Sequence, residues 1–99
     1  MNEERDMKWS TSDKKRKVRF NLAAPAGSVV SVAGDFNNWD IKANPLKEAA
    51  AGGSFSATVP LLPGRYQYKF IVNGDWRVDP ACTETVRNPF GSRNSVIVI

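Results

Sequence analysis

The sequence contains no histidine and a single cysteine, and each shortage excludes a class of protein. Without histidine, the chain lacks the commonest zinc ligand, the base of Ser-His and Cys-His nucleophile pairs, and the usual general base near neutral pH. The lone Cys82 excludes an internal disulfide. Apolar runs are only a few residues long, which excludes a membrane-spanning helix. We therefore expect no metal, no cofactor and no membrane partner.

The N-terminus is acidic and is followed by no apolar stretch, so no secretory signal is expected. Together with the single cysteine, this predicts a reducing, cytoplasmic location. The formal net charge of +4 is unevenly distributed: residues 1–19 hold seven Lys and Arg against four Asp and Glu, and residues 20–99 hold seven against six. Because nucleic-acid-binding proteins place positive charge on the folded surface, the nearly neutral body argues against a nucleic-acid partner.

Residues 1–17 are polar and show neither helical nor strand periodicity, which predicts a flexible basic leader before a domain of residues 18–99. The cluster at residues 14–17 is interpreted as part of a solvated tail, with a localisation signal or polyanion-binding patch as the alternative. Trp9 either docks back on the domain or is exposed, and the sequence leaves both possibilities open.

From Val18 onward, apolar and polar residues alternate, as in half-buried strands. Six or seven short strands with closely spaced turn signals predict an all-β antiparallel sandwich. The expected strands lie near residues 18–22, 30–34, 55–59, 65–72, 76–78 and 94–99. Residues 47–51 look locally helical, and residues 80–93 are expected to form one long loop.

Asn73-Gly74 is the strongest two-residue hairpin signal, because both central residues of that turn type need positive φ. A hairpin there places Ile71 opposite Trp76. Alternate residues of the first strand then form a continuous apolar row that faces the core: Tyr66, Tyr68, Phe70 and Val72. The same register turns Arg77 and Asp79 toward the core, so we expect the pairing to fray or bulge there.

With the core side occupied, Trp76 is expected to face outward beside Gln67 and Lys69. An exposed tryptophan next to a lysine favours a sugar ligand. The flat indole can stack on the C–H face of a sugar ring, while ammonium and amide groups meet its hydroxyls. Suitable partners elsewhere in the chain are Trp39, Ser92 and Asn94.

Five segments, taken in order, resemble one known family. They are residues 30–39 (VSVAGDFNNW), 63–70 (PGRYQYKF), 72–76 (VNGDW), Asp79-Pro80 and residues 90–97 (FGSRNSVI). Together they resemble the family 48 carbohydrate-binding modules, which include the glycogen-binding domain of the AMP-activated protein kinase β subunit and the N-terminal domains of glycogen branching and isoamylase-type debranching enzymes. Over residues 18–99 the resemblance implies an immunoglobulin-like, early-set β-sandwich that binds α-1,4-linked glucans such as glycogen or starch.

The resemblance also implies which residues bind the glucan. Trp39 and Trp76 match the two stacking tryptophans, and Lys69 matches a lysine that hydrogen-bonds sugar hydroxyls. Asn94 matches a loop asparagine whose amide spans neighbouring hydroxyls. Structural alternatives exist: Trp39 can pin its loop to the core, a role that Phe36 can take instead, and Asn94 can cap a turn.

Two matched positions depart from the kinase domain. Ser92 stands where that domain has threonine, which keeps a hydroxyl available for polar recognition. Phe90 stands where it has a leucine that inserts into the curve of the glucan. The larger ring either alters the fit around the chain or adds a third stacking surface.

An enzyme is not expected, because glycoside hydrolysis needs two carboxylates flanking the bond. The acidic candidates lie in or beside turns, where turn and surface roles are commoner: Asp35, Asp75, Asp79 and Glu84. The rival hypothesis is a protein-interaction or regulatory sandwich with little sugar affinity, against which the two exposed tryptophans argue. Nucleic-acid binding through residues 14–19 is a third hypothesis, which predicts strong salt dependence. A partner enzyme or kinase is a further expectation.

Overall fold

The computed structural model describes residues 14–99, so Trp9 and most of the predicted leader lie outside the described residues. Within residues 14–99, the regular elements are eight strands and one 3-10 helix: β1 (Arg16–Ala23), β2 (Val30–Gly34), η1 (Asp35–Asn37), β3 (Lys47–Glu48), β4 (Ser54–Leu61), β5 (Arg65–Val72), β6 (Asp75–Arg77), β7 (Thr85–Arg87) and β8 (Arg93–Val98). β1 begins two residues before the predicted boundary. None of the described residues forms a helix long and apolar enough to cross a membrane.

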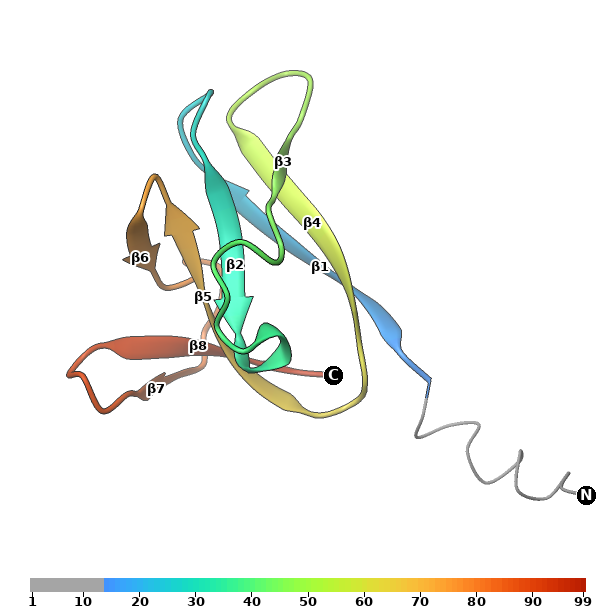
Figure 1. Cartoon of the computed structure of the whole chain (residues 1–99), viewed down its shortest axis with the longest axis vertical. Helices are drawn as coiled ribbons and strands as arrows, with labels where there is room; N and C mark the ends of the chain where they lie inside the picture. The colour runs from blue at the N-terminus through green and yellow to red at the C-terminus, as the bar shows by residue number, and fades with distance from the viewer. Residues whose placement is uncertain (1–13) are drawn as a thin grey trace, which may run out of the picture.

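The strands form two antiparallel sheets that pack as a β-sandwich, which confirms the all-β prediction (Figure 1). One sheet has the order β1-β4-β3, and the other has the order β2-β5-β8-β7 with β6 paired to β5. Because side chains alternate along each strand, one face of each sheet contributes to a shared core. The core residues are Phe20, Leu22, Val30, Val32, Leu46, Phe55, Val59, Leu61, Tyr68, Phe70 and Val72.

The β5–β6 hairpin has the predicted register. Ile71 pairs with Trp76, and both turn residues between the strands have positive φ, 50° at Asn73 and 89° at Gly74. β6 ends at Arg77, so the pairing stops where fraying was expected. Trp76 therefore lies on the face of the sheet that points away from the core.

Asp79, which the register turned toward the core, binds the hydroxyl of a core tyrosine. Tyr68 donates a 2.6 Å hydrogen bond to the Asp79 carboxylate, and the Asp79 backbone N–H donates to the Ser95 hydroxyl. Burial raises the pKa of the Tyr68 hydroxyl above its ordinary value, and the hydrogen bond to Asp79 adds to this shift. The polar residue at the edge of the core is thus satisfied by specific partners.

The prediction of a local helix at residues 47–51 is wrong. Lys47 and Glu48 form strand β3, because Lys47 pairs with Ser56 of β4. The Glu48 carboxylate accepts hydrogen bonds from the backbone N–H groups of Gly27 and Gly53. These tertiary contacts override a weak local helix preference.

The prediction of one uninterrupted loop over residues 80–93 is also wrong, because that stretch contains β7. Thr85 pairs with Ser95 and Val86 with Asn94, which makes β7 the edge strand of its sheet. The strand is only three residues long, so it is too short to show an alternating pattern in the sequence.

One edge of β5 is shared by two partners. Its first half pairs with β8 as far as Tyr68↔Ser95, and its second half pairs with β6 from Phe70↔Arg77 onward. Lys69 lies between these two pairings. β6 and the β7–β8 hairpin lie apart from each other (Figure 1), and residues of both line a cleft on the outer face of the sheet.

Candidate functional site

The cleft has a volume of about 810 Å³ and collects side chains from four separate stretches of the chain. All six residues predicted as a binding site line it: Trp39, Lys69, Trp76, Phe90, Ser92 and Asn94. Five others complete the lining: Asp35, Gln67, Arg87, Asn88 and Pro89. The fold therefore brings the whole predicted set to one place.

Two indoles form one wall of the cleft. The ring centroids of Trp39 and Trp76 lie 6.3 Å apart, and their planes are inclined by 39°. Trp76 is 48% exposed, although tryptophan is usually well buried. Two rings inclined in this way present a bent aromatic surface rather than a flat one.

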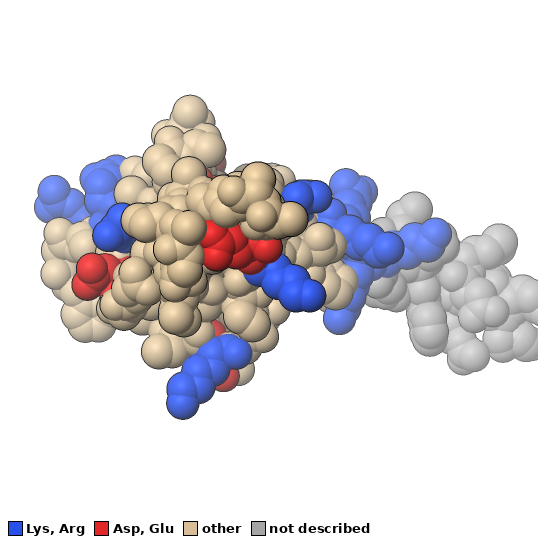
Figure 2. Space-filling model, turned by 90° about the horizontal axis from the view of Figure 1, so that it is seen from above, with Lys and Arg blue, Asp and Glu red and all other residues tan. Residues whose placement is uncertain are grey.

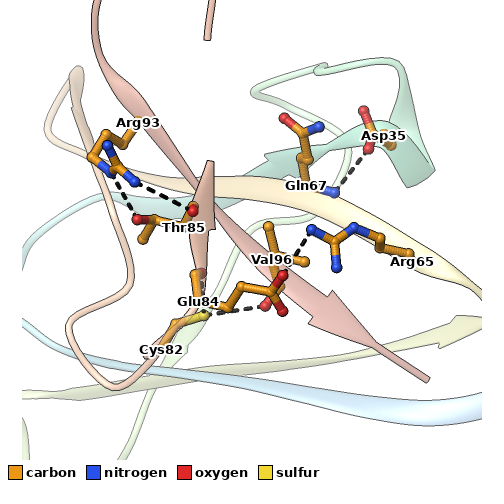
Figure 3. A network of polar contacts seen from close by, with 8 residues as sticks. All are labelled: Asp35, Arg65, Gln67, Cys82, Glu84, Thr85, Arg93 and Val96. Carbon is orange, nitrogen blue, oxygen red and sulfur yellow. Dashed lines mark hydrogen bonds and ion pairs between the residues drawn. The ribbon is translucent and has the colours of Figure 1, made fainter. Parts of the chain in front are cut away.

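Trp39 is held in the cleft by hydrogen bonds to its own loop. Its indole Nε1 donates to one Asp35 carboxylate oxygen (3.2 Å), and the other oxygen accepts the backbone N–H of Gln67 (2.8 Å; Figure 3). Phe36, rather than Trp39, packs against the core at this loop. Its ring stacks on Phe20 at a centroid distance of 5.5 Å. Phe36 thus anchors the loop, and Trp39 remains available to a ligand.

The loop that carries Trp39 begins at Gly34, where β2 lies very close to β5. At Gly34 an added Cβ would lie 2.5 Å from the backbone oxygen of Gln67, so only glycine fits there. The Asn37 side chain accepts the Gly34 N–H and donates to the Val32 carbonyl. These contacts turn the chain sharply out of β2 and direct it over the outer face of the sheet.

Lys69 and Ser92 form the polar floor of the cleft. Lys69 Nζ donates a 3.0 Å hydrogen bond to Ser92 Oγ. The sequence suggested a surface lysine, but Lys69 is only 8% exposed, because it lies where β6 and β8 both meet β5. Its stem is covered and its ammonium group reaches the cleft.

Asn88 organises the segment that carries Phe90 and Ser92. Its Oδ1 accepts the backbone N–H groups of Phe90 (3.0 Å) and Ser92 (3.2 Å), and its Nδ2 donates to Ser92 Oγ (2.7 Å) and Asn94 Oδ1 (3.1 Å). All four hydrogen-bonding positions of this carboxamide are therefore used. Sequence reasoning missed Asn88. The available signal was an asparagine before proline in a turn, where its side chain commonly bonds the backbone two residues on.

Phe90 and Asn94 lie at opposite extremes of exposure. The Phe90 ring is 91% exposed at the rim of the cleft, next to Gly91 with a φ of 86°. Asn94 is only 7% exposed, and its Nδ2 donates to Gln67 Oε1 at 3.0 Å. Phe90 therefore adds an exposed apolar surface to the rim of the cleft.

Among the acidic side chains of residues 14–99, Asp35 alone lines the cleft. Each of its oxygens already accepts a hydrogen bond, so it acts as a scaffold for Trp39. Glu84 forms a 2.7 Å ion pair with Arg65, outside the cleft (Figure 3). The described part of the cleft thus holds no pair of carboxylates of the kind that hydrolyses a glycosidic bond.

Lys and Arg side chains gather where the described chain meets its N-terminal segment (Figure 2). This end of the molecule includes the exposed residues Arg16, Lys17 and Arg19 of β1. The cleft, by contrast, is lined by two cationic residues, Lys69 and Arg87, among aromatic and amide groups. Its surface is therefore suited to a largely uncharged, hydroxyl-rich ligand.

A family model described as the glycogen recognition site of AMP-activated protein kinase matches residues 7–99 of the chain. The chain belongs to this family. The resemblance inferred from its motifs is thereby confirmed, and so is its place among the family 48 carbohydrate-binding modules. Modules of this family bind and do not catalyse.

Several curated proteins contain a similar module. Phosphoglucan phosphatase LSF1 of Arabidopsis thaliana is 41% identical over 84 residues, which cover 83% of this chain and 14% of that protein. Protein PTST homolog 2 of the same plant is 35% identical over 74 residues, which cover 75% of this chain and 13% of that protein. The 1,4-alpha-glucan branching enzyme GlgB of Clostridium perfringens is 35% identical over 86 residues, which cover 80% of this chain and 13% of that enzyme. The module thus corresponds to a small part of each relative.

Proposed function

We propose that this module binds an α-1,4-linked glucan of the glycogen or starch type in its cleft and performs no reaction on it. One observation carries the proposal: a bent pair of indoles faces hydrogen-bonding groups across a single cleft. The printed names of the relatives, which refer to phosphoglucan and to 1,4-alpha-glucan, support the same ligand class.

The aromatic surface would supply most of the attraction. An α-1,4-glucan chain curves, and indoles inclined by 39° at Trp39 and Trp76 can stack on successive sugar rings along that curve. By analogy with the stacking of nucleic-acid bases on aromatic side chains, each stacked sugar ring would contribute about 1–3 kcal/mol. We also propose that Phe90, which is exposed and lines the cleft, inserts its ring against the concave side of the chain.

The polar residues of the cleft retain hydrogen-bonding groups for sugar hydroxyls. Lys69 uses one of its three N–H groups on Ser92 and keeps two. The Ser92 oxygen accepts from Lys69 and from Asn88, so its own hydroxyl proton is available for donation. Asn94 keeps one amide N–H after its bond to Gln67. Donors therefore outnumber acceptors, and they match the oxygen-rich rim of a sugar.

A short oligosaccharide is expected to bind weakly, because association costs several kcal/mol in lost translational and rotational freedom. A polymer offers many equivalent sites, so clustered or tethered modules would hold it more firmly. Since the module supplies no chemistry, we also propose that a partner enzyme or kinase in the cytoplasm uses it to reach the glucan.

Affinity electrophoresis in a gel that contains glycogen tests this proposal. The parent should be retarded, and Trp39→Ala and Trp76→Ala should both migrate as they do without glycogen. Val29→Ala is the control, because it truncates an exposed apolar side chain outside the cleft. If the folded parent is not retarded, glucan binding is refuted and a protein-interaction module becomes the better hypothesis.

A further inference from the structure

We infer that Gln67 contacts the glucan directly, donating a hydrogen bond from Nε2 to a sugar hydroxyl, and that Asn88 and Asn94 are positioning residues which orient it. This inference rests on the proposed function and extends it to a residue outside the predicted set. It follows from a relay of three carboxamides in which each fixes the orientation of the next.

The relay begins at backbone groups whose polarity is certain. The N–H groups of Phe90 and Ser92 can only donate, and both lie within hydrogen-bonding distance of one terminal atom of the Asn88 side chain. That atom must therefore be the oxygen, Oδ1. The opposite atom, which faces Asn94, is consequently the Asn88 amide nitrogen.

The orientation of Asn94 follows from that of Asn88. An amide nitrogen at Asn88 needs an acceptor at 3.1 Å, so the atom that Asn94 presents to it is Oδ1. Asn94 Nδ2 then faces Gln67, whose contacting atom at 3.0 Å must be the acceptor Oε1. A reversed carboxamide at either step would set two donors or two acceptors against each other. Burial of Asn94, at 7% exposure, makes such a mismatch costly.

This relay leaves the Gln67 amide nitrogen free within the cleft. Gln67 is half-buried and lines the cleft, and Nε2 forms no hydrogen bond with any described residue. Its backbone N–H is bound to Asp35 (Figure 3), whose other carboxylate oxygen accepts the indole N–H of Trp39, so Gln67 is tied to the loop that carries this indole. A free N–H in this position fits a hydroxyl of a sugar stacked on Trp39.

Gln67 is the only glutamine in the chain, which permits a direct test by NMR. Protein labelled with ¹⁵N in glutamine side chains gives one pair of NH₂ signals, and a second sample reports the indole N–H signals, assigned with Trp39→Ala and Trp76→Ala. On titration with maltoheptaose, the Gln67 NH₂ pair should shift and show nuclear Overhauser effects to sugar protons. Indole signals that shift while the Gln67 pair does not would overturn this inference alone. Unchanged signals in both samples would instead overturn the proposed function.

Asn88→Asp tests the relay, because a carboxylate can accept the two backbone N–H groups but cannot donate to Asn94. The Asn94 carboxamide should then flip, so that its NH₂ group donates to the new carboxylate. The Gln67 carboxamide should flip in turn, so that its NH₂ group donates to Asn94 Oδ1. The indole signals should still respond to maltoheptaose, whereas the Gln67 NH₂ pair should not. Asn21→Asp, on the exposed surface of β1, controls for the added charge. An undiminished Gln67 response in the Asn88→Asp protein would refute the positioning role.

Gln67→Ala provides the corresponding affinity measurement. Loss of one neutral hydrogen bond should weaken maltoheptaose binding by about 2- to 10-fold. An affinity equal to that of the parent, measured in the folded variant by titration calorimetry, would show that the Gln67 side chain contributes no contact.

Discussion

Phe90→Ala should separate binding from stability more cleanly than any other substitution in the cleft. Complete burial of a phenylalanine side chain is worth about 1.5–3 kcal/mol, so a glucan that covers about half of the ring would gain about 1 kcal/mol from it. Truncation should therefore raise the dissociation constant roughly 5-fold. Stability should not change, because the ring is 91% exposed and its backbone N–H keeps the bond to Asn88.

Titration calorimetry with maltoheptaose and thermal unfolding by circular dichroism measure the two quantities. The unfolding free energy of Phe90→Ala should stay within about 0.5 kcal/mol of the parent value, which corresponds to about 3 °C in Tm. Phe90→Leu should retain most of the affinity. Val98→Ala is the matched control, because Val98 is also an exposed apolar residue but lies outside the cleft, and neither quantity should change.

Two results would refute this reasoning. An unchanged affinity in the folded Phe90→Ala variant would show that the glucan does not reach the rim of the cleft. A fall in Tm well beyond 3 °C, without a change in affinity, would show that Phe90 packs on the protein rather than on the ligand.

Two further substitutions test the fold beneath the cleft. Gly34→Ala places a Cβ within 3 Å of Gln67, Phe36 and Tyr68, and should destabilise the module by about 1–3 kcal/mol in chemical unfolding; full stability would contradict the close approach of β2 and β5. Tyr68→Phe tests pH dependence: burial and the bond to Asp79 raise the Tyr68 pKa, so neutral Tyr68 stabilises the parent fully below about pH 10 and progressively less above it. The variant should lack this alkaline loss, and identical alkaline profiles would refute it.

Local patterns predicted most of the sandwich correctly. Alternation along Val18, Phe20 and Leu22 identified a half-buried strand, and the Asn73-Gly74 turn fixed the pairing of Ile71 with Trp76. Both signals are local, since one depends on a period of two and the other on backbone conformations that few residues adopt. The strands that escaped prediction, β3 and β7, are two and three residues long and form because a distant partner strand is present.

The residues of the candidate site also fall into two groups: those that sequence motifs predicted, and those that depend on contacts between distant segments. The family motifs carried the six predicted residues, and all six line the cleft. Gln67 and Asn88 also line the cleft but were missed, because each is joined to the site by a carboxamide contact with Asn94. These contacts depend on how β8 lies against β5 and against the segment before it. The low exposure of Lys69 likewise depends on two strands meeting β5 at one point.

Strand β5 carries core residues on one face and cleft residues on the other. Consecutive positions are therefore under different selection, one for folding and the next for what the cleft binds. Under the proposed function, a substitution at the half-buried Gln67 weakens recognition and leaves the domain folded, whereas a substitution at the buried Tyr68 or Phe70 destabilises the domain itself. A lineage can therefore discard the ligand and retain the sandwich as a spacer or docking unit. The opposite order is not possible, because the cleft residues are held in position only while the core is folded.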